Sequence, residues 1–444
     1  MKVEITVKVD GQLITQHVEQ VEGTLEQMEE TIDALSRKVA GQTLQASVDA
    51  VPQSRPSFSA ASGSFRHKGY RCRTLIGLHG PVVIRRARYR CSKSGKMICP
   101  LDSILDLPGC GVTVSLSRRA LRLATFTSFG PLQEELWIHH GVRLSDSTLD
   151  MLMQEAGGVA EQDRQAEITQ LSSASAGLHR EELLTVDRVD SVPSRLYVSC
   201  DGVMYCTRYR ELDAENPKER KLIYQEMKAG TVFWQDRNDR WHKQVISGRD
   251  KPEQFGLSLW ALAVRCGMLQ AAEVIFISDG GSWCNTVAEM YFKDATRILD
   301  WYHLSEHIWA AGRQLYPDDA KGAKRWVSTC LTHLHDSSGM GLLRHLERSR
   351  KVRTASGQAI IDELVGYVRP RVAITDYVDY RAAGYVIGSG MMESTCKQLV
   401  SQRLKGPGMQ WSERGALAMT ALVAHRLNGT WDRFWGSRPL QRAA

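Results

Sequence analysis

The sequence has little that would anchor it in a membrane or stabilise it with disulfides. No uninterrupted hydrophobic run approaches the ~20 residues that a bilayer-spanning helix needs. The opening stretch, MKVEITVKVD, alternates like a strand and lacks the apolar centre of a signal peptide. The ten cysteines include no Cys-x-x-Cys pair, and scattered thiols of this kind are usually small buried side chains. We therefore expect a cytoplasmic protein.

Acidic residues are absent from one long segment of a chain that is otherwise close to balanced. The 444 residues carry a net charge of +7 and are enough for two or three domains. No Asp or Glu lies between Asp49 and Asp102, whereas this segment contains Arg55, Arg66, Lys68, Arg71, Arg73, Arg85, Arg86, Arg88, Arg90, Lys93 and Lys96. A segment of one charge attracts phosphate backbones, so we predict that Arg85, Arg86 and Arg88 bind DNA. A hairpin kept soluble by its charge is the alternative.

Four cysteines around this segment outline a zinc ribbon without completing one. They are Cys72, Cys91, Cys99 and Cys110. Structural zinc commonly takes closely spaced Cys or His pairs, and Ser94 stands where the second thiol of a Cys-x-x-Cys pair would be. We expect a degenerate, zinc-ribbon-like hairpin without zinc.

The N-terminal half is predicted to be an α+β, DNA-binding half. The alternation around Asp10-Gly11 favours a hairpin, and the three-to-four-residue spacing that follows favours a helix. Gly141 separates two helical segments, and Ser145 is placed to cap the second, which gives the outline of a helix-turn-helix or of a plain helical hairpin. The predicted parts are residues 1–48 (hairpin and helix), 64–112 (basic β-hairpin) and 113–170 (helical).

The second half alternates strands with helices, which predicts an α/β fold with a mixed sheet covered on both faces. RLYVSCDGV, KLIYQEMKAGTVFW, WHKQVISG and AEVIFISDGG are the strand candidates before a mostly helical stretch. The predicted parts are residues 195–304 (first part of the sheet domain), 305–384 (helical insertion) and 385–436 (a final part with an acid-bearing helix).

Two acids follow apolar strands directly and precede glycine. Asp201 lies in YVSCDG and Asp279 in FISDGG, at what we predict are the carboxyl ends of neighbouring strands, where α/β sheets bind ligands. Two such carboxylates repel unless a cation lies between them, and hard oxygen ligands suit Mg²⁺ or Mn²⁺. Glu393 follows a Gly-Ser-Gly turn and is a third acid. The alternatives are plain turns for the Asp-Gly pairs and helix-dipole stabilisation for Glu393.

The motifs SCDG, ISDGGSW, ILDWYHLSEH, IGSGMMESTCKQLVSQRLKGPGMQWS and LNGTWDRFW together resemble DDE transposases of bacterial insertion sequences, specifically the ISKra-type group. The resemblance runs from about residue 196 to 436 and more loosely through PLDSILDLP. It implies an RNase H-like domain with a helical insertion, in which Asp201, Asp279 and Glu393 hold two Mg²⁺ or Mn²⁺ ions. Ser94 departs from the pattern of the group.

Further residues are expected to support such a site. On the helix after Glu393, Lys397, Arg403 and Lys405 are predicted to contact phosphates, and Met392, Cys396, Leu399 and Val400 to form its buried stripe. Asp300 and His303 are predicted to support the catalytic acids, with His307 four residues further on. Trp283 is placed either to stack on an unpaired base or, more ordinarily, in the core.

The sequence thus predicts a DNA transposase that binds the terminal inverted repeats of its insertion sequence, cuts DNA with metal ions and joins it to target DNA. Pairing two ends implies a homodimer or a higher oligomer. The alternatives are a domesticated, inactive DNA-binding regulator and a two-metal nuclease without strand transfer. A carboxylate-pair glycosidase is more distant, because it would not need the basic surfaces.

Overall fold

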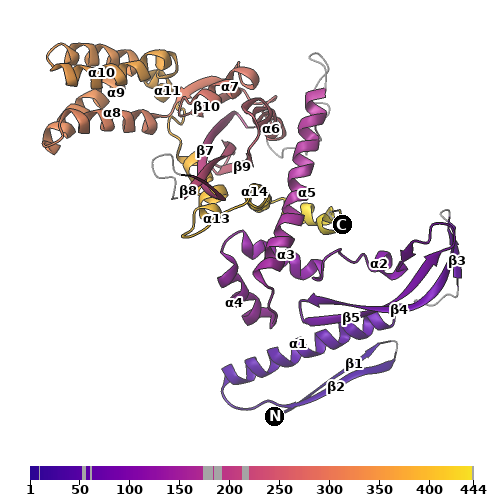
Figure 1. Ribbon diagram of the computed structural model, residues 1–444. Coiled ribbons are helices and arrows are strands. Elements are labelled where there is room, and N and C mark those ends of the chain that lie inside the picture. The colour runs from indigo at the N-terminus through magenta and orange to yellow at the C-terminus, as the bar shows by residue number, and fades with distance from the viewer. Residues whose placement is uncertain are drawn as a thin grey trace. The chain divides into compact units, whose positions relative to one another are not determined.

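The computed structural model describes residues 1–9, 11–52, 57–60, 63–173, 184, 193–212 and 220–442. Asp10, Arg55 and parts of the segments that link the predicted domains lie outside these residues. The chain forms two compact units, one of Met1–Ala160 with Thr430–Ala444 and one of Glu161–Gly429 (Figure 1).

The first unit contains the predicted hairpin and helix. Strands β1 and β2 pair antiparallel, and α1 begins at a capping box in which the Thr24 side chain accepts from the Gln27 backbone N–H. The basic hairpin is β4 and β5, the centre of a four-stranded sheet in the order β3-β4-β5-β6. The bounds are β1 (Lys2–Val9), β2 (Gln12–Gln20), α1 (Leu25–Asp49), β3 (Ser57–Ala60), β4 (Gly63–Gly77), β5 (Gly80–Cys91) and β6 (Met97–Ile98).

Helices complete this unit, as the pattern of residues 113–170 predicts. Gly141 ends α4 in the left-handed region at φ 64°, where glycine is favoured, and the Ser145 hydroxyl accepts from the Thr148 backbone N–H near the start of α5. Two short C-terminal helices belong here, and Arg118 forms an ion pair with Asp432. The bounds are α2 (Pro100–Ile104), α3 (Val114–Ala124), α4 (Phe129–His140), α5 (Asp146–Ser173), α15 (Trp431–Gly436) and α16 (Pro439–Arg442). The residues of α5 from Glu161 on belong to the second unit.

The second unit is built on a mixed five-stranded sheet in the order β11-β10-β7-β8-β9. The strands β7, β10 and β11 are parallel, whereas β8 and β9 continue the sheet antiparallel, which confirms the predicted mixed α/β sheet. The bounds are β7 (Arg195–Leu212), β8 (Arg220–Gln235), β9 (Trp241–Gly248), β10 (Glu273–Ser278) and β11 (Thr296–Leu299).

Neighbouring residues of a strand point to opposite sides of the sheet. Helices pack against both sides and form two cores. Leu196, Val198 and Cys200 of β7 pack against α6 (Pro252–Arg265) and α7 (Ser282–Tyr291). Tyr197 lies in a second core with residues of α8 (Trp301–Leu315) and α9 (Ala320–Arg350).

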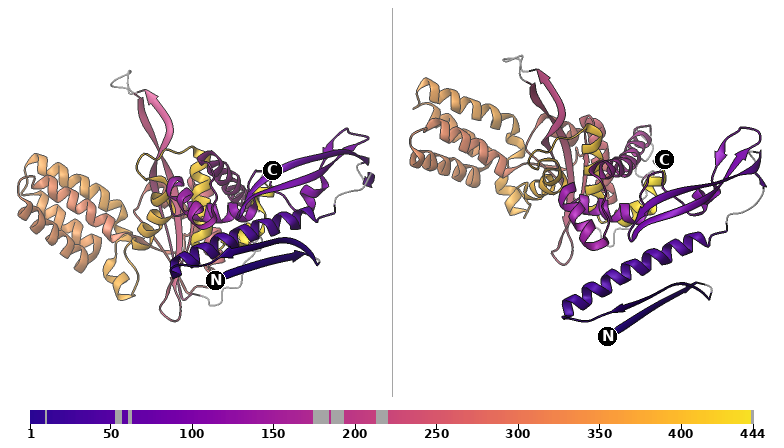
Figure 2. Two further views of the ribbon diagram at one scale, coloured as in Figure 1. Left: turned by 90° about the horizontal axis from the view of Figure 1, so that it is seen from below. Right: turned by 60° about the horizontal axis from the view of Figure 1, so that its bottom comes forward.

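The predicted helical insertion consists of helices that lie side by side in Figures 1 and 2. The helix α9 is interrupted at Ser337 and Ser338, whose backbone angles are not helical. Helix α10 (Ala355–Val368), the 3-10 helix η2 (Arg369–Ile374) and α11 (Tyr377–Ala382) follow. Among the described residues, no helix is both long and apolar enough to cross a membrane.

The chain then forms the helix that carries Glu393. It is α12 (Gly390–Thr395), which continues through the π-helix η3 (Cys396–Ser401) into α13 (Gln402–Leu404) and is followed by α14 (Glu413–Leu427). Its predicted apolar stripe is confirmed, since Met392, Cys396, Leu399 and Val400 are all buried.

One predicted strand boundary is wrong. We expected the first strand of this sheet to end at Asp201, but β7 continues to Leu212, and Asp201 and Gly202 pair with Ala229 and Lys228 of β8. Glycine is suited to this position because a Cβ on Gly202 would lie 1.9 Å from the Glu226 carboxylate, which folds across it. The Asp201-Gly202 pair is therefore part of a strand and not a turn.

Candidate active site

Asp201 and Asp279 occupy equivalent positions on neighbouring parallel strands. The last paired residues of β7 and β10 are Ser199 and Ile277, and each acid stands two residues further along the chain, Asp201 within β7 and Asp279 just after β10. The two acids are close enough for the charge of Asp279 to raise the pKa of the Asp201 carboxyl. The parallel edge of the sheet thus brings together two of the three predicted catalytic acids.

The surroundings of Asp201 disfavour its charge. Burial is the main cause that raises the pKa of the Asp201 carboxyl; the hydrogen bond from the Gly202 backbone N–H opposes that shift. This N–H lies 2.6 Å from Oδ1, and the Cys396 thiol donates to Oδ2 over 3.8 Å. Because Cys396 follows Glu393 by three residues, the helix of Glu393 packs directly against Asp201.

Asp279 lies in a tight turn after β10. Its Oδ1 accepts from the Gly281 backbone N–H at 2.8 Å. Gly280 has φ 76°, a left-handed conformation that favours glycine, and a Cβ there would lie 2.6 Å from Arg371 Nε. The turn is therefore fixed both by its own backbone and by side chains of the helical insertion.

Glu393 is exposed in the first turn of α12, whereas Asp201 and Asp279 are half-buried. Its carboxylate accepts from the Ser389 hydroxyl over 3.3 Å. Burial is the main cause that raises the pKa of the Cys396 thiol, and the charges of Asp201 and Glu393 raise it further. Both acids therefore lie within electrostatic range of this thiol.

Asp300, a predicted supporting residue, anchors the turn that precedes Glu393. It is 4% exposed, and its Oδ1 accepts from the backbone N–H of Tyr302 at 3.0 Å and of Ser389 at 3.1 Å. The Ser389 hydroxyl donates to Asp300 Oδ2 at 2.5 Å, a much closer contact than the one to Glu393. A hydroxyl has one hydrogen, so Ser389 chiefly holds the turn to Asp300 and leaves the Glu393 carboxylate able to turn.

The two histidines of α8 contact each other and the insertion. His303 Nε2 lies 3.3 Å from His307 Nε2, and the charge of His303 slightly opposes the rise in the pKa of Asp201. The His307 ring stacks on Tyr367 with a centroid distance of 3.8 Å. Burial is the main cause that lowers the pKa of His307, which favours its neutral form.

No group of three or more His, Cys, Asp or Glu side chains that could hold a metal ion occurs among the described residues. The predicted triad is accordingly two neighbouring aspartates and a third, exposed acid whose carboxylate is not gathered with them. For the N-terminal cysteines, Cys91 and Cys110 are buried and Cys72 is exposed on β4.

The three cations predicted to contact phosphate have different surroundings. Lys397 and Lys405 are exposed, as such a contact requires. Arg403 is 2% exposed, with its guanidinium 5.9 Å from the Trp411 ring, and burial lowers its pKa to about 10. The prediction that Arg403 contacts DNA is wrong for this structure, because its charge lies in the interior.

A lysine that the sequence reading missed lies against the same helix. Lys243 of β9 donates to Ser394 Oγ at 3.3 Å and to Gln398 Oε1 at 3.0 Å, and burial lowers its pKa. Nothing in WHKQVISG distinguishes this lysine from a solvated one. The partners lie about 150 residues later, so only the folded sheet reveals the contact.

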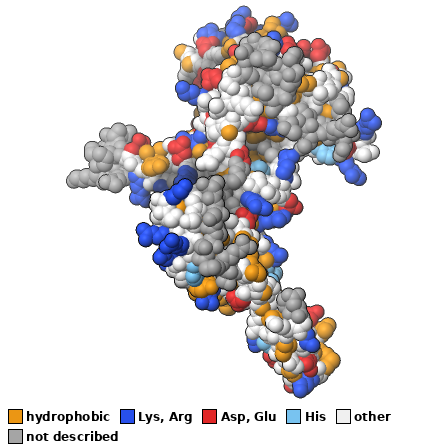
Figure 3. All heavy atoms as spheres, turned by 90° about the vertical axis from the view of Figure 1, so that its right-hand side faces the viewer, with side chains coloured by type: hydrophobic (Ala, Val, Ile, Leu, Met, Phe, Trp, Pro, Cys, Tyr) orange, Lys and Arg blue, Asp and Glu red, His pale blue; other side chains and the backbone are white. Residues whose placement is uncertain are grey.

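The predicted DNA-binding residues of the basic hairpin also differ from one another. Arg85 is exposed and lies 3.9 Å above the ring of Tyr70, and Arg88 is half-buried. Arg86 is wrong as a DNA contact, because its side chain is 10% exposed and forms an ion pair with Asp102. On the face drawn in Figure 3, Lys and Arg side chains occur in small groups, with acidic side chains between several of them.

Trp283 packs within the second unit. Its ring meets Phe255 edge-on at 5.7 Å, and Lys228 Nζ lies 5.3 Å from its centroid. This favours the core interpretation over base stacking.

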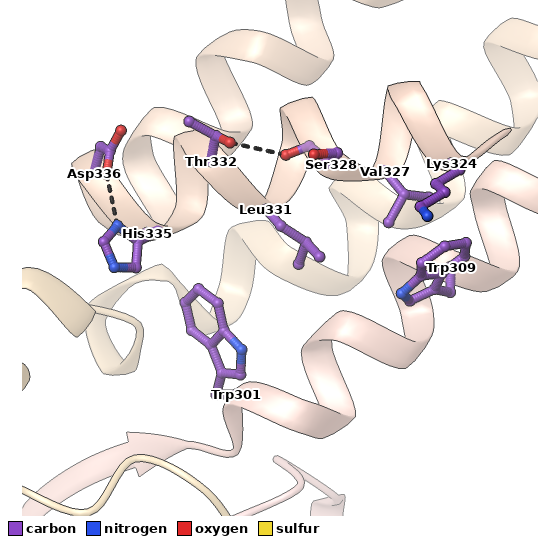
Figure 4. Close-up of a pocket in the computed structure, with 9 residues that line it drawn as sticks. All are labelled: Trp301, Trp309, Lys324, Val327, Ser328, Leu331, Thr332, His335 and Asp336. Carbon is purple, nitrogen blue, oxygen red and sulfur yellow. Dashed lines mark hydrogen bonds and ion pairs between the residues drawn. The ribbon is translucent and has the colours of Figure 1, made fainter. Parts of the chain in front are cut away.

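A separate cavity of about 420 Å³ lies between α8 and α9 (Figure 4). Trp301 and Trp309 of α8 face Leu331 and Val327 of α9, with Lys324 near one end and His335 and Asp336 near the other. None of the three predicted catalytic acids lines it. It is therefore not the candidate active site.

Comparisons with known proteins give one family and no activity. An uncharacterised protein family, UPF0236, matches residues 194–436, which is more than half of the chain. Curated proteins yield no match. A solved structure with a detectable likeness is the Drosophila P element transposase strand transfer complex, with 10% sequence identity, 73% of this chain and 80% of that chain covered, and a TM-score of 0.25. A likeness this low supports no conclusion about this chain.

Proposed function

The chain belongs to the uncharacterised protein family UPF0236. On that premise, and from the site itself, we propose that it is a DDE transposase of the ISKra-type group. It would bind the terminal inverted repeats of its insertion sequence, cut DNA at their ends and join the freed ends to target DNA. Because two ends must be paired, we propose that it acts as a dimer or a higher oligomer.

One observation carries this proposal. Asp201 and Asp279 stand at matched positions beyond the pairing of β7 and β10, and the helix of Glu393 packs on Asp201 through Cys396. Three carboxylates are thereby supplied by two strands and one helix of the same sheet domain. Carboxylates so placed suit divalent metal ions that transfer phosphoryl groups.

The donors are carboxylate oxygens, the type that Mg²⁺ and Mn²⁺ prefer, although the three acids are not gathered into one group among the described residues. Burial chiefly, and the charge of Asp279 to a lesser degree, raise the pKa of the half-buried Asp201 carboxyl, and a cation beside these acids would favour their charged forms. Asp201, Asp279 and Glu393 would hold the ions. When bound, the metal would make a nucleophile of water or of a 3′-hydroxyl and stabilise the leaving oxygen.

The order of the strands supports an RNase H-like domain. Numbered along the chain within this sheet, the strands lie in the order 3-2-1-4-5, with the first three antiparallel and the last two parallel to the first. Asp201 lies on the first strand and Asp279 follows the fourth, which is a direct neighbour of the first.

The surface around Glu393 suits a polyanion. Lys397 and Lys405 are exposed on the helix of Glu393 and after it, and Lys243 binds the side chain of Ser394 beside that acid. Lysine side chains suit contacts that position a phosphate backbone more than contacts that read bases. In the first unit, Arg85 and Arg88 would add contacts to DNA.

The test is an assay of cleavage and joining on a labelled duplex that carries the inverted repeat flanking the gene. With Mg²⁺ or Mn²⁺ we expect cuts at the repeat boundary and joined products, and with EDTA neither. Glu393→Gln should abolish both while leaving DNA affinity unchanged. Glu413→Gln is the matched control, since Glu413 is an exposed acid that pairs with Arg249, and it should cut like the wild type.

The outcomes separate the alternatives. Cuts without joined products would make the protein a two-metal nuclease. Specific binding without any cutting would make it a DNA-binding regulator. Cleavage that survives Glu393→Gln would refute the assignment of the acids.

A further inference from the structure

The helical insertion grips the turn that carries Asp279. The Tyr367 hydroxyl, at the end of α10, donates to the Asp279 backbone carbonyl at 2.9 Å. Arg371, in η2, donates to the Gly280 carbonyl through Nη2 at 2.9 Å and through Nε at 3.3 Å. Asn285 of α7 adds a third side-chain donor to the same carbonyl at 3.2 Å.

The two gripping side chains are themselves held in a three-layer stack. The guanidinium of Arg371 lies 4.2 Å from the centroid of the Tyr367 ring, and the ring of His307 stacks on Tyr367 at 3.8 Å and 22°. Arg371 Nη1 also donates to the Tyr367 carbonyl at 2.8 Å. The stack fixes the direction of the hydrogen-bond donors, because a stacked guanidinium keeps its plane.

The turn is shaped to accept this grip. Gly280 is at φ 76°, and a Cβ there would meet Arg371 Nε at 2.6 Å and Leu299 Cδ1 at 2.9 Å. Any other residue would push the guanidinium away. The close approach of the insertion to this backbone therefore depends on glycine at this position.

We propose that His307, Tyr367 and Arg371 form a clamp that sets the position of Asp279. The helical insertion would then position one of the catalytic acids. The proposal rests on the proposed function. The three are positioning residues, because Tyr367 and Arg371 hold the backbone of the turn, His307 stacks on Tyr367, and the clamp acts through Asp279. Asp300, which caps α8 and holds Ser389, anchors the turn before Glu393.

The experiment combines a readout of local order with two functional ones. Hydrogen exchange at the backbone amides of Gly281 and Asn285 reports on the turn, since these amides bond to Asp279 Oδ1 and to the Gly281 carbonyl. Mn²⁺ affinity and the cleavage rate at saturating DNA are measured alongside it. The variants are Arg371→Ala, Arg371→Lys and Tyr367→Phe.

Arg369→Ala is the matched control, because Arg369 is an exposed arginine in the same 3-10 helix that pairs with Glu347. For Arg371→Ala we expect these amides to exchange about tenfold faster or more. We also expect weaker Mn²⁺ binding and cleavage slower by about 10- to 100-fold, with unchanged DNA affinity. Arg371→Lys should resemble it, because lysine cannot stack as a plane. Tyr367→Phe keeps the stack and should give a smaller loss, and Arg369→Ala none.

The clamp would be overturned if Arg371→Ala and Tyr367→Phe left exchange at these amides unchanged. Faster exchange throughout β7 and β10, or equal losses in the Arg369→Ala control, would also overturn it by showing a general structural effect. A wild-type protein that cuts no DNA, combined with local loosening in the Arg371 variants, would keep the clamp and reject the proposed function.

Discussion

At the scale of single residues, two glycines of one turn have different surroundings. A Cβ on Gly388 would lie 2.5 Å from the ring of Tyr302, whereas a Cβ on Gly390 would meet nothing within 4 Å. The ring belongs to the first turn of α8, to which the Ile387 carbonyl and Ser389 also bond. The absence of a side chain at Gly388 thus permits the turn before Glu393 to approach α8.

Gly388→Ala should therefore displace this turn and slow DNA cleavage by about 10- to 100-fold, because small misplacements of catalytic groups are costly. Gly390→Ala is the natural control and should cut within about twofold of the wild type, since alanine suits a helix. Cleavage rates at saturating DNA, with DNA affinity measured in parallel, make the comparison. Equal rates for the two variants would contradict this role of Gly388.

The sequence motifs identified the three candidate catalytic acids but not the side chains that hold their backbone in position. The apolar stripe of Met392, Cys396 and Leu399 was predictable from helical spacing. Arg403 lies in α13, just after the π-helix η3, whose wider turn displaces the residues that follow it from that spacing. Tyr367 and Arg371 lie 88 and 91 residues from the carbonyls that they grip. No local pattern could indicate such contacts.

At the scale of elements, an ion pair joins the first paired residues of the parallel strands β7 and β10. Arg195 pairs with Glu273 in register, and the Tyr385 hydroxyl donates to Glu273 Oε1 at 2.8 Å. The hydrogen bond from Arg195, followed by that from Tyr385, lowers the pKa of Glu273 below its ordinary 4.5. These contacts favour the charged form of Glu273.

The sign of the pH dependence follows from this lowered pKa. The stabilisation is fully present above about pH 4.5 and is lost as the pH falls through the lower, folded-state pKa. Glu273→Gln should therefore lower the thermal unfolding midpoint at pH 6 and approach the wild type at pH 3. Thermal unfolding at several pH values measures this, and a difference that grew as the pH fell would contradict it. Because both side chains are more than a third exposed, we expect a small effect.

The basic hairpin offers a second comparison at this scale, between adjacent arginines. Arg85 is exposed and held over Tyr70, whereas Arg86 is tied to Asp102. Arg85→Ala should weaken DNA binding and reduce the slope of log affinity against log salt concentration by about one. Arg86→Ala should keep that slope and lower the thermal stability instead. Fluorescence anisotropy with a duplex at several salt concentrations tests both, and an unchanged slope for Arg85→Ala would remove it from the DNA contacts.

Alternation and helical spacing were sufficient to predict most elements. The strands β8 and β9 and the helical insertion lie where the sequence indicates them. The continuation of β7 through Asp201-Gly202 was not predictable, because the dipeptide is a common turn signal. Only the pairing with β8, and the Glu226 side chain lying across Gly202, show that it is a strand here.

At the scale of the whole molecule, the division of the chain differs from its order in sequence. The segment Thr430–Ala444 groups with the first unit, although we predicted residues 385–436 as one part of the sheet domain. The ion pair of Arg118 with Asp432 joins sequence positions more than 300 residues apart. Charge patterns and motifs indicate which segments we propose for DNA binding and for DNA cutting. They do not indicate that the C-terminal segment groups with the N-terminal unit.

The central claim is that Asp201, Asp279 and Glu393 hold the metal ions of a DNA-cutting site. The most direct measurement is anomalous X-ray diffraction from crystals of the full chain with an end duplex and Mn²⁺, using Glu393→Gln to prevent cutting. We expect anomalous density between Asp201 and Asp279, lost when Asp201→Asn is added. Mn²⁺ bound elsewhere, or no density at these acids at a concentration that supports cleavage by the wild type, would contradict it.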